Sequence, residues 1–162
     1  MAIFFDTHAH LDAPDFASDI AAVAARAEAA GIVKIISIGT DLESSRRAIR
    51  LAEQFPSVFA AVGWHPSHVN EAPEDIRPAL RELARHPKVV ALGETGLDYY
   101  RLPSKKAGFT AADDERYKAR QAALFQQHLE VAAETGLGCV IHQRESLEDI
   151  LAQLAPCASR VR

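Results

Sequence analysis

The sequence alternates between short apolar segments of strand length and longer segments in which apolar residues recur at helical spacing. The apolar segments are nearly continuous and rich in β-branched residues, which is typical of strands buried on both faces of a parallel sheet. Parallel strands need a crossover between them, and the helical segments supply it. The pattern predicts an α/β protein with strands at 3–6, 33–38, 58–62, 89–92 and 139–141 and helices at 18–30, 41–55, 75–85, 114–135 and 146–154.

About five strand–helix units are compatible with two architectures, an open doubly wound sheet and part of a (β/α)8 barrel. The glycine-rich phosphate loop that follows the first strand of a dinucleotide-binding fold is absent. A complete barrel takes roughly 250 residues, whereas this chain has 162. The pattern alone therefore leaves an open sheet and a partial barrel as alternatives.

Composition excludes some classes of protein. An apolar content of 48% and a net charge of -4 describe an ordinary globular chain without the basic face that broad nucleic-acid binding needs. A compact site in which metal ions supply the positive charge remains compatible with this balance. The two cysteines, Cys139 and Cys157, lack disulfide-like spacing, and no segment is apolar for long enough to span a membrane. We therefore expect a cytoplasmic protein with no membrane association.

Polar residues recur where the predicted strands end, which is the edge at which parallel α/β folds build active sites. Imidazole and carboxylate groups are the ligands that Zn and Mn use. Each residue alone has another explanation, such as a helix cap or a histidine satisfied in the core, but their common edge favours a metal site. The residues are His8 and His10 after the first strand, His65 after the third, Glu94 after the fourth and His142 after the fifth. Asp6 is placed to orient a ligand by accepting a hydrogen bond.

Four motifs occur in an order that resembles the N-terminal part of the TatD family of metal-dependent deoxyribonucleases, within the amidohydrolase-like barrel enzymes. Gly-Glu-Thr-Gly-Leu-Asp-Tyr is the most specific of them, and His-x-His alone is shared by several hydrolase families. The motifs are Asp-Thr-His-Ala-His-Leu-Asp at 6–12, Gly-Trp-His-Pro at 63–66, Gly-Glu-Thr-Gly-Leu-Asp-Tyr-Tyr at 93–100 and Ile-His-Gln-Arg at 141–144. The resemblance implies a single partial domain over 1–162, made of the parallel βα units of a TIM-type barrel and truncated after about five units.

The resemblance also implies a metal centre and a reaction. His8 and His10 would bind one divalent ion and His142 a second, with Glu94 bridging the two; Mg, Mn and Zn all suit such ligands. The implied activity is hydrolysis of phosphodiester bonds in DNA or in a small phosphodiester by metal-activated water. Glu94 and His65 are the expected catalytic residues, and His65 would also contact phosphate.

Further residues would support ligands or bind substrate. Asp98, like Asp6, would orient a metal ligand. Arg144 would clamp a phosphate, although an arginine at this position is as often in a surface ion pair. Trp64 and Tyr99 would stack on an unpaired base, although aromatic residues near a barrel mouth more often serve packing.

The family pattern continues beyond residue 162 with another ligand histidine and an aspartate, and neither is found here. We expect a truncated product whose open sheet exposes the edges of its first and last strands and its barrel-facing apolar side chains. The full-length family form would be a monomer, whereas here a dimer or aggregation through the open edges is expected. Two alternatives to an active nuclease stand: an inactive fragment or metal-binding remnant that needs a complementary chain, and an amidohydrolase-like enzyme acting on a C–N bond.

Overall fold

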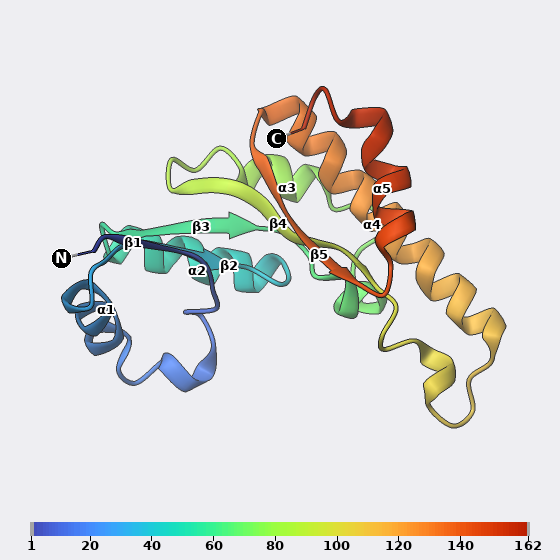
Figure 1. Ribbon diagram of the computed structural model, residues 1–162, viewed down its shortest axis with the longest axis horizontal. Helices are drawn as coiled ribbons and strands as arrows, with labels where there is room; N and C mark the ends of the chain where they lie inside the picture. Colours follow the sequence, from blue (N-terminus) through green and yellow to red (C-terminus); the bar gives the residue numbers. More distant parts are fainter. Residues whose placement is uncertain (1, 162) are drawn as a thin grey trace.

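The computed structural model describes residues 2–161 and contains one five-stranded sheet, all parallel, in the order β1-β2-β3-β4-β5. The sheet curls into a half-barrel with β1 and β5 as its free edges, as Figure 1 shows. The strands are β1 (Phe4–Ala9), β2 (Ile32–Ile38), β3 (Val58–Val62), β4 (Val89–Asp98) and β5 (Gly138–Arg144). The α-helices are α1 (Ile20–Ala29), α2 (Leu42–Gln54), α3 (Arg77–Leu83), α4 (Ala111–Thr135) and α5 (Leu147–Leu154), and short 3-10 turns are η1 (Pro14–Phe16), η2 (Pro66–Glu71), η3 (Pro103–Lys105) and η4 (Ala155–Cys157).

Alternation along β3 shows why the sheet has two different faces. Val58, Ala60 and Val62 are fully buried in the main core, where helices α2 and α4 pack against the sheet. The intervening Phe59 and Ala61 point to the opposite, concave face. The parallel α/β architecture and the partial barrel are thus confirmed.

The concave face leaves apolar side chains open to solvent. Phe5 is 60% exposed and Val90 38% exposed, and both line a hollow of about 230 Å³ together with Phe59. This exposure confirms the expectation for barrel-facing side chains in an open sheet. The expectation that every strand is buried on both faces is wrong for β1, where Phe4 is also 55% exposed, because β1 is an edge strand.

Strands β4 and β5 extend further than the sequence pattern predicts. Their pairing continues from Thr95↔Ile141 to Asp98↔Arg144, beyond the apolar segments that marked the strands. Glu94 and His142 therefore lie inside strands and not after their ends. Within residues 2–161, none of the helices combines the length and the apolar character needed to cross a membrane.

Candidate metal centre

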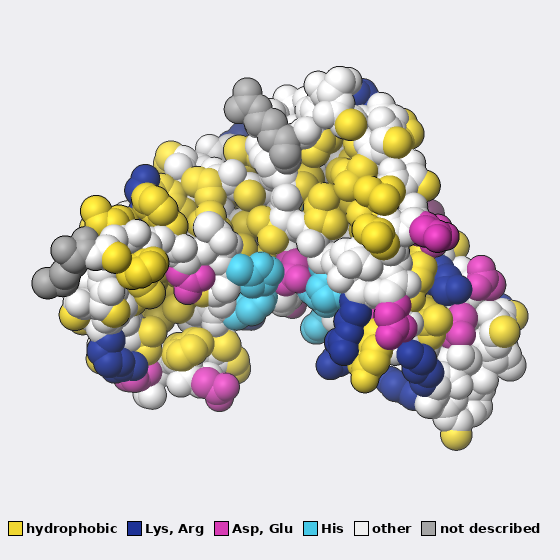
Figure 2. Space-filling model, viewed as in Figure 1, with side chains coloured by type: hydrophobic (Ala, Val, Ile, Leu, Met, Phe, Trp, Pro, Cys, Tyr) yellow, Lys and Arg dark blue, Asp and Glu magenta, His cyan; other side chains and the backbone are white. Residues whose placement is uncertain are grey.

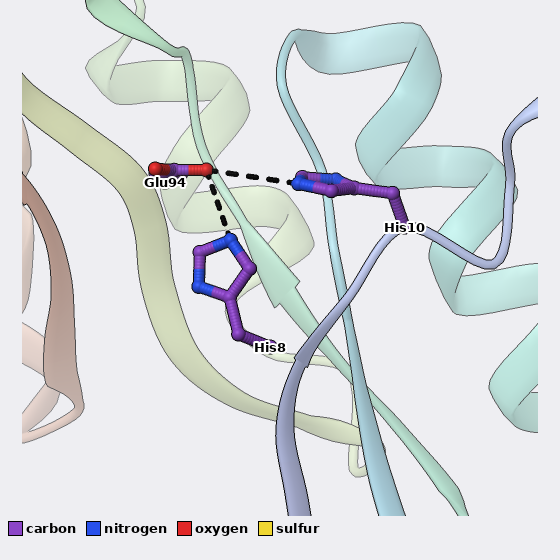
Figure 3. Close-up of side chains that lie close together, drawn as sticks. All are labelled: His8, His10 and Glu94. Carbon is purple, nitrogen blue, oxygen red and sulfur yellow. Dashed lines mark ion pairs between the residues drawn. The ribbon is translucent and has the colours of Figure 1, made fainter.

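Glu94 of β4 is the buried centre of the site, with 8% of its surface exposed. On one side of its carboxylate, Oε2 lies 3.2 Å from Nε2 of His8 and 3.9 Å from Nε2 of His10. Figure 3 shows both imidazoles directed at this one oxygen from the end of β1. The two rings meet edge to face with centroids 5.2 Å apart. The predicted His-x-His pair therefore converges on Glu94.

The second carboxylate oxygen faces a different pair of histidines. Oε1 lies 2.9 Å from Nδ1 of His142 on β5 and 3.7 Å from Nε2 of His65, which follows β3. The nearest nitrogens of these two imidazoles are 3.0 Å apart. His65, expected as a phosphate contact, thus lies within reach of the same point as His142.

These two groups fit divalent cations. Each offers three ligand atoms that all lie within 4.8 Å of one another: His8, His10 and Glu94 in the first group, and His65, Glu94 and His142 in the second. Bonds of roughly 2.0–2.2 Å from one ion to imidazole nitrogen and carboxylate oxygen require ligand atoms at about such separations. Each oxygen of Glu94 faces one of the two groups, so its carboxylate belongs to both.

Backbone and hydroxyl groups orient the imidazoles. Nδ1 of His10 lies 3.0 Å from the carbonyl oxygen of Ile38; a hydrogen bond donated there leaves Nε2 with its lone pair toward Glu94. Nδ1 of His65 contacts the hydroxyl of Ser67 at 2.7 Å, which directs Nε2 to the second group. Neither Ile38 nor Ser67 was a sequence candidate, since a carbonyl contact across strands leaves no residue pattern.

Burial and neighbouring charges shift the pKa values of His65, His142 and Glu94 in different ways. Burial lowers the pKa of His65 to about 4, so its imidazole is neutral at pH 7. The hydrogen bond to Glu94 raises the pKa of His142. Burial alone would raise the pKa of Glu94, but the hydrogen bond from His142 and the charges of the histidines outweigh it and lower that pKa. The carboxylate is therefore ionised and ready to bind a cation.

The two predicted supporting carboxylates differ in what they contact. Oδ2 of Asp98, only 3% exposed, lies 3.2 Å from Nε2 of His142 and holds that ring from behind. Asp6 instead accepts a hydrogen bond from the backbone N–H of His8 at 3.1 Å. Asp6 therefore positions the backbone of His8 and not its imidazole ring.

Two buried polar side chains of α4 hold the loops of the site, and sequence reasoning missed this. The backbone N–H of Trp64 donates to Nε2 of fully buried His128 at 3.0 Å. Gln121, also fully buried, accepts from the backbone N–H of Asp98 at 2.9 Å and donates to its carbonyl at 3.1 Å. Helical spacing could have revealed these two residues, because both lie on the buried face of α4 together with Phe125.

Three of the four predicted substrate contacts, Trp64, Tyr99 and Arg144, are not members of the two histidine groups. The indole of Trp64 is 7% exposed in the main core and donates to the carbonyl of His68 at 2.9 Å. The hydroxyl of Tyr99 donates to Asp149 at 2.7 Å. Burial counts against base stacking by Trp64, whereas stacking on Tyr99 stays a prediction. Arg144 is exposed, with its guanidinium over the Tyr100 ring.

A parallel half-barrel that gathers four histidines around one buried glutamate is typical of a metal-binding protein of the α/β-barrel class. Comparison with protein-family models narrows this class. The chain belongs to the family described as TatD related DNase, whose model matches residues 5–160. The family resemblance seen in the motifs is thereby confirmed.

Individual relatives match over nearly the whole chain. The uncharacterized metal-dependent hydrolase YabD of Bacillus subtilis is 34% identical over 152 residues, which is 94% of this chain and 55% of YabD. The 3'-5' ssDNA/RNA exonuclease TatD of Enterobacter lignolyticus is 35% identical, over 94% of this chain and 54% of that protein. The crystal structure of YJJV, a TatD homologue from Escherichia coli K12, superposes with a TM-score of 0.81 at 32% identity, over 94% of this chain and 55% of that one. The chain therefore spans about half the length of these relatives.

Proposed function

We propose that this chain is a metal-dependent phosphodiesterase that acts on DNA. The observation that carries the proposal is the position of Glu94, whose two oxygens face two separate histidine groups. The exonuclease name of the Enterobacter relative supports nucleic acid as the substrate. A pair of divalent ions, Mn, Mg or Zn, suits this mixed nitrogen and oxygen ligand set.

His8 and His10 would hold one ion, and His65 and His142 the other, with Glu94 shared by both. When bound, such ions act as Lewis acids on phosphoryl oxygen and activate water for attack on phosphorus. Glu94 would supply negative charge to both cations. His65 is neutral at pH 7, and its Nδ1 accepts from the backbone N–H of Ser67 at 3.1 Å, so Nε2 carries the proton and would donate it to a phosphate oxygen. To hold a cation, Nε2 would have to give up this proton, with Nδ1 donating to the Ser67 hydroxyl instead. Asp98 keeps His142 in one orientation.

Arg144 is proposed to bind substrate phosphate, because its exposed guanidinium offers forked N–H donors two residues beyond His142. We also propose a cytoplasmic location, supported by the two free cysteines. Cell fractionation with an antibody to the chain tests the location; recovery in an oxidising compartment would contradict it.

The test of function is hydrolysis of bis(p-nitrophenyl) phosphate and of single-stranded DNA by the purified chain, with Mn²⁺ or with EDTA. Glu94→Gln removes the shared charge, and Glu53→Gln, an exposed glutamate that contacts His86, is the matched control. We expect Mn²⁺-dependent hydrolysis by the wild type and by Glu53→Gln, with a loss of at least 100-fold in Glu94→Gln.

Equal hydrolysis by wild type and Glu94→Gln would contradict the proposal. Binding of Mn²⁺ that requires Glu94, without turnover, would favour the alternative of a metal-binding module that works only with a complementary chain. Cleavage of a C–N bond in place of the phosphodiester would favour the amidohydrolase-like alternative.

A further inference from the structure

Two basic side chains converge on one exposed aromatic ring beside the second histidine group. The guanidinium carbon of Arg144 lies 3.6 Å from the ring centre of Tyr100, and the ammonium of Lys105 lies 4.9 Å from it. Tyr100 is 44% exposed, and the side chain of Lys105 is 54% exposed. Figure 2 shows basic side chains gathered next to histidine on this face of the molecule, where β4 and β5 end.

Strand geometry makes this cluster continuous with the metal centre. Arg144 follows His142 by two residues on β5, so both side chains leave the same face of the strand, roughly 6.6 Å apart along it. Arg144 is also paired in register with Asp98, whose carboxylate contacts His142. The backbone of Tyr99 donates to the carbonyl of Arg144 at 2.9 Å, which fixes Tyr100 directly beyond this pair.

The cluster carries more positive charge than its neighbours neutralise. Glu145 lies 3.9 Å from the ammonium of Lys105. Within residues 2–161, no carboxylate lies within 4 Å of the guanidinium of Arg144. Two cations close together repel each other, and the negative face of the Tyr100 ring offsets part of that repulsion. The ring therefore holds the cations in place instead of offering a free face to a base.

On these grounds, and resting on the proposed function, we propose that Arg144 and Lys105, held by Tyr100, bind the phosphodiester that neighbours the one at the histidine groups. A substrate with a single phosphodiester has no second phosphate to place against Arg144 and Lys105, whereas a longer polynucleotide strand has one. The substrate class of this site is then an oligonucleotide strand with at least two consecutive phosphodiesters. Arg144 supplies a planar fork for phosphate oxygens, and Lys105, which also donates to the carbonyl of Tyr100, supplies a compact point charge.

Binding is tested by fluorescence anisotropy with a labelled oligothymidylate, in EDTA so that no metal-dependent cleavage occurs, over a series of salt concentrations. The variants are Lys105→Ala and Arg144→Ala, and the matched control is Arg46→Ala, an exposed arginine of α2. We expect each of the first two to raise Kd roughly three- to tenfold and to reduce the slope of log K against log salt by about 0.7. We expect Lys105→Arg to retain most of the affinity and Arg46→Ala to change neither quantity.

A second arm compares wild-type affinity for a dinucleotide with one phosphodiester and a trinucleotide with two. Tighter binding of the trinucleotide, lost in Lys105→Ala, supports the subsite. Identical affinities and salt slopes for Lys105→Ala, Arg144→Ala and Arg46→Ala would overturn the subsite, even where Mn²⁺-dependent hydrolysis persists and the proposed function stands. Loss of binding in the two variants of a chain that shows no hydrolysis would support the subsite and count against the proposed function alone.

Discussion

Nδ1 of His142 lies 2.9 Å from Oε1 of Glu94, the carboxylate that both histidine groups share. The other ring nitrogen of His142 lies 3.2 Å from Oδ2 of Asp98. An imidazole donates from both nitrogens only when it is protonated, and the hydrogen bond to Glu94 raises the pKa of His142 above its usual 6.5. A fraction of the metal-free molecules therefore has both ring nitrogens of His142 protonated at pH 7. One of these protons must leave before a cation can bind to the ring.

Metal affinity should accordingly rise as the pH increases from about 6 to 8. Calorimetric titration with Mn²⁺ in buffers of different ionisation enthalpy measures the proton released. In Asp98→Asn, which keeps an acceptor for the backbone N–H of Tyr100, the pKa of His142 falls and fewer protons are released at pH 7. Asp149→Asn is the control. Equal proton release in wild type and Asp98→Asn would contradict this explanation.

The sequence predicts the elements well where apolar residues alone define them. The strand predicted at 58–62 is observed as Val58–Val62, because every one of its residues is apolar. The pattern fails at β4 and β5, whose observed strands extend through Glu94 and His142. Hydrogen bonding between two paired strands, and not apolar character, sets those ends.

The candidate site shows a similar division. The common edge of the predicted strands led to the prediction that five side chains lie close together. In the structure they form two groups that share Glu94; the residues are His8, His10, His65, Glu94 and His142. The roles of individual side chains depend on contacts that spacing does not encode. Burial of the Trp64 ring follows from packing against the core, and the sequence records the residue type but not its partners.

His128 should make folding stability depend on pH. Burial lowers its pKa to about 4 from 6.5 in the unfolded chain, so the unfolded state binds more protons between these values. Stability is therefore complete above about pH 6.5 and falls by about 3 kcal/mol as the pH drops toward 4. Urea denaturation at several pH values measures this slope in wild type and in His128→Gln, which keeps an acceptor for Trp64 N–H but does not titrate.

We expect a smaller pH slope in His128→Gln than in wild type, with the remaining slope due in part to His65, whose pKa is also about 4. His86→Gln, which removes a histidine at the surface contact with Glu53, should leave the slope unchanged. A wild-type slope in His128→Gln would show that His128 does not stay neutral in the folded chain.

Gln121 should contribute to stability through the backbone of Asp98. Gln121→Leu leaves a buried N–H and a buried carbonyl of Asp98 without partners, at a cost of about 3 kcal/mol for the two groups. The matched control is Gln126→Leu on the exposed side of α4, expected within about 0.5 kcal/mol of wild type. Comparable free energies of unfolding for the two variants, measured by urea denaturation, would refute this role.

Gly96 should be irreplaceable because it lies directly against His142. Its φ of +130° is unfavourable for a side chain, and a Cβ there would collide with the backbone oxygen of His142, its register partner on β5. Gly96→Ala is expected to cost about 3 kcal/mol or more and to move His142 away from Glu94, which weakens Mn²⁺ binding as well. Gly136→Ala is the control, since its φ is +71° but its Cβ would meet nothing within 4 Å; strain alone costs about 1 kcal/mol. Equal losses in the two variants, measured by denaturation and calorimetry, would mean that backbone strain and not the collision with β5 decides the effect at Gly96.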